Sequence, residues 1–174
     1  HWDSRPRADQ DSTRKDEPIL GADDGGSSTA VALEIARLLK NTPVNIGIDI
    51  VLFDAEDDGI EGDENTYCLG TQYWGKNPHI PGYTARYGIL LDMVGAADAT
   101  FLKEQNSMKV APQVVDMVWN TAAELGYSSM FIADTDFSPS ITDDHIFVNS
   151  LAHIPTIDII NYVPYRGFGR HWHT

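Results

Sequence analysis

Acidic and histidine side chains recur at one kind of place in this sequence, directly after a predicted strand or directly before a predicted helix. The groups concerned are Asp23 with Asp24, Glu56 with Asp57, Asp92 at the end of ILLD, Asp143 with Asp144 and His145, and His171 with His173; His1 and Asp3 open the chain. Open α/β sheets form ligand sites beyond the carboxyl ends of their strands, so these side chains are expected to meet at one edge. Carboxylates and imidazoles gathered there, without cysteines, suit zinc in an open catalytic site.

Each of these residues also has a purely structural interpretation. Asp23 and Asp24 could cap a helix, where free N–H groups favour an anion. Glu56 and Asp57 could form a solvated strand end. Asp92 lies inside an apolar run and could be a buried carboxylate that is paired for stability alone. The set as a whole therefore indicates more than any single member does.

Composition excludes several classes of function. The chain has 174 residues, a formal net charge of −14 and a pI near 4.5, which disfavours nucleic acid and anionic membrane surfaces as partners. The single cysteine, Cys68, excludes an internal disulfide and a cysteine-rich metal site. No apolar run approaches the ~20 residues of a membrane span. A G-x-S-x-G nucleophile elbow is absent, and the acidic pair in GADDGGSS would repel a phosphate.

Apolar periodicity predicts the elements that would position these groups. Helices are predicted over residues 28–40, 68–76, 111–126 and 145–152, the first of them capped by Ser27 or Ser28. Strands are predicted over residues 45–55, 87–95, 99–104 and 154–162, and the first is expected to be buried on both faces of a parallel sheet. The alternation predicts an α/β fold with a mixed, largely parallel central sheet flanked by helices. The length predicts one domain over residues 1–174, and the two ends suggest a segment of a longer chain.

Six short motifs occur in the order found in one known group of enzymes. They are HWDSRP, GADDGGSS, DAEDDG, LLDMVG, DDHIF and HWHT. In this order they resemble the zinc metallopeptidase clan that contains secreted aminopeptidases and animal-type glutaminyl cyclases. Within that clan, CLGTQYW, DMVGAADATF and FGRHWHT are most similar to bacterial zinc-dependent glutaminyl cyclases. The resemblance implies a zinc-exopeptidase-like fold over essentially the whole chain.

The resemblance also implies a role for individual residues. Asp24, Asp57 and His173 match the zinc ligands of the cyclases, and Glu56 matches their catalytic acid and base. Asp92 and Asp143 match the carboxylates that surround that glutamate. Trp172 and Phe168 match aromatic residues of the substrate pocket. Two departures stand out: Asp57 replaces the glutamate of many members, and the loop over residues 58–67 lacks a tryptophan.

Three functions remain open on this resemblance. A one-zinc glutaminyl cyclase would convert the N-terminal glutamine of peptides or proteins to pyroglutamate and release ammonia. A two-zinc aminopeptidase would hydrolyse N-terminal residues, with His1 and Asp92 binding the second zinc and Asp24 bridging the two ions. An inactive peptide-binding domain would have kept the pocket without either activity. Family members of this kind are exported, so the resemblance implies a periplasmic or secreted protein.

Overall fold

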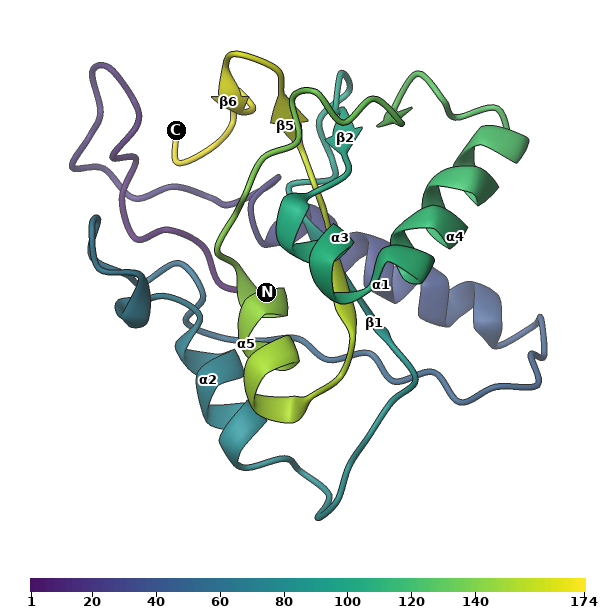
Figure 1. The fold of residues 1–174 in the computed structure, drawn as a ribbon. Helices are drawn as coiled ribbons and strands as arrows, with labels where there is room; N and C mark the ends of the chain where they lie inside the picture. Colours follow the sequence, from purple (N-terminus) through teal and green to yellow (C-terminus); the bar gives the residue numbers. More distant parts are fainter.

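The computed structural model describes all residues from 1 to 174, and it combines helices with short, mostly parallel strands (Figure 1). The helical elements are α1 (Gly26–Leu39), η1 (Glu64–Thr66), α2 (Leu69–Lys76), α3 (Gln105–Val110), α4 (Pro112–Glu124), α5 (Asp144–Phe147) and η2 (Val148–Ala152). The strands are β1 (Gly88–Asp92), β2 (Phe101–Leu102), β3 (Phe131–Ile132), β4 (Thr156–Ile160), β5 (Tyr162–Val163) and β6 (Gly167–Phe168). The predicted α/β class is confirmed.

The parallel pair of β1 and β4 is the longest pairing in the fold. It runs in register from Gly88 opposite Thr156 to Asp92 opposite Ile160. All five residues of β4 are buried, as expected of a strand with both faces covered. The pair brings Asp92 to the end of β1, where a parallel sheet places its ligand sites. The other sheets are two-stranded: β2 with β3 in parallel, and β5 with β6 as an antiparallel hairpin.

The apolar core lies between α4 and the strands. Val115 and Trp119 of α4 are almost fully buried and pack in one cluster with Phe101 and Ile157. The ring of Trp119 meets Phe131 edge-on at 5.5 Å between centroids, and its indole N–H donates to the carbonyl of Ile132 at 3.1 Å. The predicted helix over residues 111–126 is therefore confirmed, because its apolar stripe is the face that this core covers.

The first helix begins two residues earlier than predicted and is capped differently. Its N-cap is Gly25 at φ 85°, and no side chain caps it. Ser27 and Ser28 instead lie in the first turn, where their hydroxyls donate to the carbonyls of Asp23 (2.5 Å) and Gly25 (3.2 Å). The turn needs glycine, because a Cβ on Gly25 would lie 2.0 Å from the carbonyl oxygen of Asp3. The serine-cap prediction was wrong for this reason.

The predicted strand over residues 45–55 is not paired. The segment carries no strand assignment, and its apolar side chains, including Ile46, Ile48 and Leu52, are exposed. Backbone hydrogen bonds reach only its end, where Phe53 O accepts from Trp2 N at 3.0 Å and Asp54 O from Gly70 N at 3.0 Å. β-Structure requires a neighbouring ladder, which a local apolar pattern cannot guarantee.

The remaining elements agree with the sequence in type and differ in extent. The strands predicted over residues 87–95, 99–104 and 154–162 are confirmed as the shorter β1, β2 and β4. The helix predicted over residues 145–152 is α5 followed by the π-helical turn η2. The helix predicted over residues 68–76 is confirmed as α2, and it packs against α5 and η2 (Figure 1). The six-residue α3 was not predicted. No helix of the structure has the length and apolarity needed to cross a membrane.

Candidate metal centre

Three predicted ligands meet in one buried group. Asp24 lies in the turn before α1, Asp57 lies two residues after the unpaired segment 45–55, and His173 is the penultimate residue. His173 Nε2 lies 3.1 Å from Asp57 Oδ1 and 3.6 Å from Asp24 Oδ2. All three are at most 5% exposed, and their candidate ligand atoms lie within 4.8 Å of one another. Two carboxylates and one imidazole form a donor set that fits a zinc ion with an open fourth position.

Two observations within this group fit a cation. Asp57 Oδ2 is buried and has no hydrogen-bond partner, so an oxygen with a negative charge lacks a protein donor. The other ring nitrogen of His173, Nδ1, lies 3.1 Å from Asp9 Oδ1, which leaves Nε2 pointing at the two aspartates. Carboxylates that hold a histidine in this way orient it as a metal ligand. Arg5 fixes Asp9 in turn, because its Nε donates to Asp9 Oδ2 at 2.8 Å.

Replacing Asp9 with alanine is expected to lower the zinc affinity about 10–100-fold, as the loss of a carboxylate behind a ligating histidine does. The measurement is a competition titration with a zinc chelator. Asp16→Ala is the control, because the Asp16 side chain is 96% exposed and lies outside this group. Equal zinc affinity of the Asp9 variant and the control would contradict the orienting role of Asp9.

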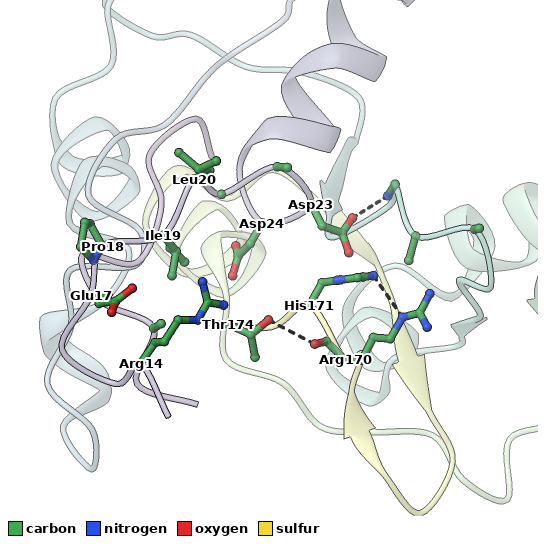
Figure 2. A pocket seen from close by; sticks show the side chains of 16 residues that line it. Arg14, Glu17, Pro18, Ile19, Leu20, Asp23, Asp24, Arg170, His171 and Thr174 are labelled. Carbon is green, nitrogen blue, oxygen red and sulfur yellow. Dashed lines mark hydrogen bonds between the residues drawn. The ribbon is translucent and has the colours of Figure 1, made fainter. Parts of the chain in front are cut away.

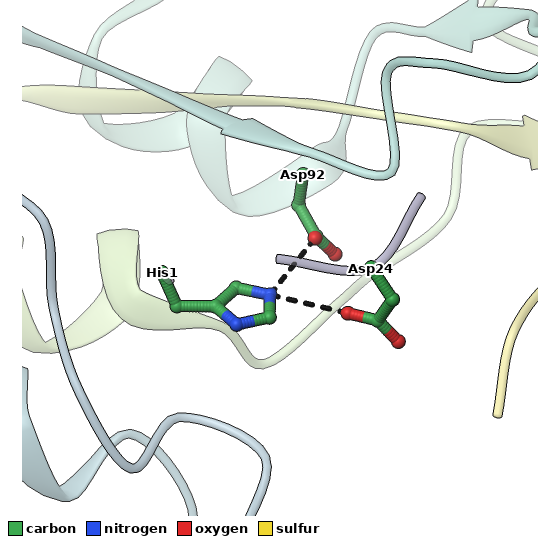
Figure 3. A group of neighbouring side chains, drawn as sticks. All are labelled: His1, Asp24 and Asp92. Atoms are coloured by element: carbon green, nitrogen blue, oxygen red, sulfur yellow. Dashed lines mark hydrogen bonds and ion pairs between the residues drawn. The ribbon is translucent and has the colours of Figure 1, made fainter. Parts of the chain in front are cut away.

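A second group shares Asp24 with the first (Figure 3). His1 Nε2 lies 3.1 Å from Asp92 Oδ1 and 3.2 Å from Asp24 Oδ1. The two oxygens of Asp24 therefore face different histidines, Oδ1 toward His1 and Oδ2 toward His173. A carboxylate placed in this way can bridge two ions, so the geometry accommodates either one metal or two.

Burial and neighbouring charges raise the pKa values of Asp24 and His1, which belong to these two groups. Burial, together with the charges of Asp92 and Asp57, raises the pKa of Asp24 to about 6, although the hydrogen bond with His1 opposes the shift. Burial alone would lower the pKa of His1, but its hydrogen bonds to Asp24, Asp3 and Asp92 raise it well above the ordinary value. Crowded carboxylates that share a site cannot all ionise cheaply, and a divalent cation relieves this crowding.

Glu56 lies at the edge of both groups. Its Oε2 is 3.8 Å from His1 Nε2, and its Oε1 accepts from the thiol of Cys68 at 3.4 Å. Burial and the nearby charge of Asp143 raise the pKa of Glu56 well above its usual value. Burial also raises the pKa of Cys68, so the thiol keeps its proton and acts as the donor. A glutamate with a raised pKa is suited to general acid–base catalysis near neutral pH.

The backbone around Glu56 is held in place by the first residues of the chain. The carboxylate of Asp3 accepts from the N–H of Glu56 and from the N–H of Asp57, each at 3.2 Å. Ala55, just before them, adopts φ 52°, a left-handed conformation that is uncommon for alanine. Met93, just after Asp92, does so at φ 47°. Strained residues of this kind concentrate at functional sites.

The two predicted pocket aromatics pack beside the third ligand. The rings of Phe168 and Trp172 are 4.8 Å apart between centroids, and those of Trp172 and His173 are 4.5 Å apart. Both aromatic side chains are half-buried and pack against the small apolar cluster of Met93, Ile141 and Ile160. They therefore form an apolar wall next to the donor set.

Comparison with known proteins identifies the family of this chain. The sequence model of peptidase family M28 matches residues 1–174. The chain belongs to peptidase family M28. No curated protein sequence matches it.

Solved structures of relatives of this M28 chain carry two kinds of name. It is similar to a glutaminyl cyclase from Porphyromonas gingivalis (52% identity, TM-score 0.96) and to a Bacteroides thetaiotaomicron glutaminyl cyclase bound to N-acetylhistamine (48%, 0.95). It is also similar to a Zn-dependent exopeptidase from Parabacteroides distasonis (51%, 0.93). Each match covers 100% of this chain and 62% of the other chain, so the M28 chain spans about three fifths of these relatives.

Not every candidate residue of the M28 chain lies in the donor set. His171 is exposed, accepts from Arg170 Nε at 3.2 Å, and lines a cavity of about 470 Å³ that borders Asp24 (Figure 2). Glu56 and Trp172 do not line this cavity. Asp23 accepts from the N–H of Gly95 at 2.8 Å, which is a structural role.

Arg5, Asp9 and Cys68 were not predicted as site residues. Arg5 and Asp9 lie in a polar N-terminal loop with no periodic signal, so nothing local distinguishes them from solvated charges. The single Cys68 indicated only that an internal disulfide and a cysteine-rich metal site are excluded, and its neighbour Glu56 is 12 positions away. All three act through long-range contacts that spacing alone does not reveal.

Proposed function

We propose that this chain carries the catalytic site of a zinc-dependent glutaminyl cyclase, which converts N-terminal glutamine of peptides or proteins to pyroglutamate and releases ammonia. The observation that carries the proposal is the buried donor set of Asp24, Asp57 and His173 beside Glu56, whose pKa is raised. The names of the Porphyromonas gingivalis and Bacteroides thetaiotaomicron relatives support it. Zinc is supported by the donor set and by the name of the Zn-dependent exopeptidase relative.

Asp24, Asp57 and His173 would hold the ion. When bound, a zinc ion there supplies a Lewis acid that withdraws charge from the side-chain amide oxygen of the substrate glutamine. The attacking group is the substrate's own α-amine, which closes a five-membered ring on its side-chain amide carbon. Proximity is therefore provided by the substrate, and the protein must orient it, move one proton and exclude water.

Glu56 is the proton carrier in this proposal. As a carboxylate, it takes a proton from the attacking amine and then returns it to the leaving ammonia. Asp92 and Asp143 flank it as acidic neighbours, and the charge of Asp143 helps to raise the pKa of Glu56. Trp172 and Phe168 would cover the apolar stem of the glutamine and keep out the water that would otherwise hydrolyse the amide.

Activity should depend on pH with an acid limb set by Glu56. Its pKa is raised, and only the ionised form accepts a proton, so kcat/KM should fall as the pH drops through a value well above the ~4.3 of a free glutamate. The measurement is kcat/KM for a Gln-initiated peptide against pH at constant ionic strength. An acid limb near pH 4 would contradict the assignment of Glu56 as the base.

A two-zinc aminopeptidase is the second candidate function. The shared carboxylate of Asp24 between His1 and His173 favours it, as does the name of a leucine aminopeptidase precursor from Bacteroides thetaiotaomicron at 48% identity. In that case His1, Asp92, Asp24, Asp57 and His173 would hold two ions, and Glu56 would be the base that takes a proton from the attacking water. An inactive peptide-binding domain is disfavoured, because all predicted ligands are present and meet.

One experiment separates the three functions. The zinc-loaded protein is assayed for ammonia release from a Gln-initiated peptide and for hydrolysis of leucine anilide, and its bound zinc is counted. The cyclase predicts one zinc, ammonia release and no anilide cleavage. Two zinc ions with anilide cleavage would establish the peptidase, and neither activity would favour the binding domain. The partners of the proposed cyclase would be peptides or proteins with an N-terminal glutamine. We also propose a periplasmic or secreted location, because the chain resembles a family whose members are exported.

A further inference from the structure

One short segment of the N-terminal loop, residues 5–10, contacts two of the proposed zinc ligands. Arg5, at its start, donates to the backbone of Asp57, which lies 52 positions further along the chain. Asp9, near its end, contacts the ring of His173, which lies 164 positions further along. Asp57 and His173 come from distant parts of the sequence, so the segment joins two ligands that nothing local brings together.

The guanidinium of Arg5 binds the loop that carries Asp57. Its Nη1 donates to the carbonyl of Asp57 at 2.7 Å and to the carbonyl of Gly59 at 2.6 Å. A charged donor makes short and strong hydrogen bonds, and the Arg5 side chain is only 12% exposed, so water competes little for them. The N–H of Asp57 is held as well, because it donates to Asp3 Oδ2 at 3.2 Å. Both backbone polar groups of Asp57 are therefore fixed by N-terminal residues.

The same guanidinium acts on His173 through Asp9. Arg5 Nε donates to Asp9 Oδ2 at 2.8 Å, and the other oxygen, Asp9 Oδ1, lies 3.1 Å from His173 Nδ1. The next residue, Gln10, fixes the backbone there, because its N–H donates to the carbonyl of His173 at 3.1 Å. His173 adopts φ 51°, an uncommon left-handed conformation. Such a conformation persists only where the surroundings hold it, and the segment 5–10 provides those contacts.

This arrangement requires the planar fork of an arginine. Arg5 uses Nη1 for the two carbonyls and Nε for Asp9, so one rigid group fixes three acceptors in set directions. Its Cζ also lies 5.7 Å from the centre of the Tyr67 ring, within the range of a cation–π contact. That ring packs closely on Gly59, where an added Cβ would lie 2.1 Å from Cδ2 of Tyr67. A lysine ammonium is a point charge and cannot replace these contacts together.

The charge of Arg5 opposes a bound cation. Arg5 contacts the backbone of one proposed ligand and the carboxylate beside another, so its positive charge lies near the position of the ion. Like charges repel, and by charge alone Arg5 would weaken zinc binding. A positioning role has the opposite effect, because ligands that are already in place cost less to order when the ion binds. The sign of the change in zinc affinity therefore separates the two roles.

We propose that Arg5 is a positioning residue of the zinc site, which sets the relative placement of Asp57 and His173 before an ion binds. It acts on Asp57 through the backbone and on His173 through Asp9, and it touches neither the ion nor the substrate. The inference rests on the metal centre of the proposed function, and it holds for either reaction that the site would catalyse.

Two variants of Arg5 test the proposal by their zinc affinity. Arg5→Met removes the charge and the fork but keeps a side chain of some length, and the affinity should fall about 10–100-fold, as when the support of a ligand is lost. Arg5→Lys keeps the charge without the fork and should lose nearly as much. Arg7→Met is the matched control, because it removes the same charge from a side chain of the same segment that is 68% exposed, and it should not lower the affinity. The measurement is competition with a zinc chelator, on proteins that circular dichroism shows to be folded.

Nuclear magnetic resonance of the metal-free protein gives a second result that needs neither zinc nor activity. The Nε–H of Arg5 should exchange slowly with water, because Asp9 accepts from it, whereas the Nε–H of the exposed Arg7 should exchange fast. Asp9→Ala should speed the exchange at Arg5. The proposal is overturned if Arg5 exchanges as fast as Arg7, or if either Arg5 variant, when folded, binds zinc as tightly as the unaltered protein. If the unaltered protein binds no zinc, the metal centre of the proposed function fails, and the Arg5 signal alone decides whether the segment is held as described.

Discussion

Replacing Glu56 with glutamine should lower kcat for pyroglutamate formation about 10²–10⁴-fold, the range expected when a general base is lost. The amide keeps the size of the side chain but cannot take the proton of the attacking amine. Bound zinc should be unchanged, because Glu56 lies outside the group formed by Asp24, Asp57 and His173. The measurements are steady-state kinetics on a Gln-initiated peptide and the zinc content of the same preparation.

The matched control is Glu61→Gln, which makes the same chemical change on an exposed residue of the adjacent loop and should leave kcat unaltered. Glu56→Gln with nearly full activity would remove Glu56 from the mechanism. A variant that had lost both zinc and activity would instead show that Glu56 is needed to build the metal site.

Replacing Asp57 with alanine should abolish zinc binding and, with it, activity. Asp57 Oδ1 lies 3.1 Å from His173 Nε2, and its Oδ2 has no protein partner, so the side chain is placed for a cation and little else. The backbone at this position should survive, because Arg5 donates to the Asp57 carbonyl at 2.7 Å irrespective of the side chain. The zinc affinity should fall by more than the ~10–100-fold expected for Asp9, which only orients a ligand.

Asp58→Ala is the control for this second variant, since Asp58 is the next residue along the chain and is exposed. It should retain both zinc and activity. Asp57→Ala that still held zinc with the original affinity would mean that the ion binds elsewhere, for example between His1 and Asp92. Circular dichroism of both variants verifies that the comparison is made between folded proteins.

The place of the candidate site was predictable because its residues mark the ends of elements, whereas the choice of Asp24, Asp57 and His173 as zinc ligands came from the resemblance to the cyclases. Asp24 before a helix, Asp57 after an apolar segment and Asp92 at the end of β1 each stand out locally, and the parallel pair of β1 and β4 carries Asp92 to the expected edge. What spacing could not give is that Asp24 faces His1 with one oxygen and His173 with the other. That arrangement depends on joining the two ends of the chain.

The elements that the sequence predicted wrongly or did not predict depend on long-range contacts. Residues 45–55 have the composition of a buried strand, yet pairing depends on a neighbouring strand that composition does not supply. The short helix α3 forms because Glu104 caps it, with its side chain accepting from Asn106 N and Ser107 N. Glu104 looked like a strand end in the sequence, and its contact with His145, 41 positions later, could not be foreseen locally.

Anomalous diffraction at the zinc absorption edge, from crystals of the zinc-loaded protein, tests the central claim most directly. We expect one strong peak at about 2.0–2.2 Å from a carboxylate oxygen of Asp24, a carboxylate oxygen of Asp57 and Nε2 of His173. Glu56 should lie beside the ion without binding it. A peak held only by His1 and Asp92, or no peak near His173, would contradict the account.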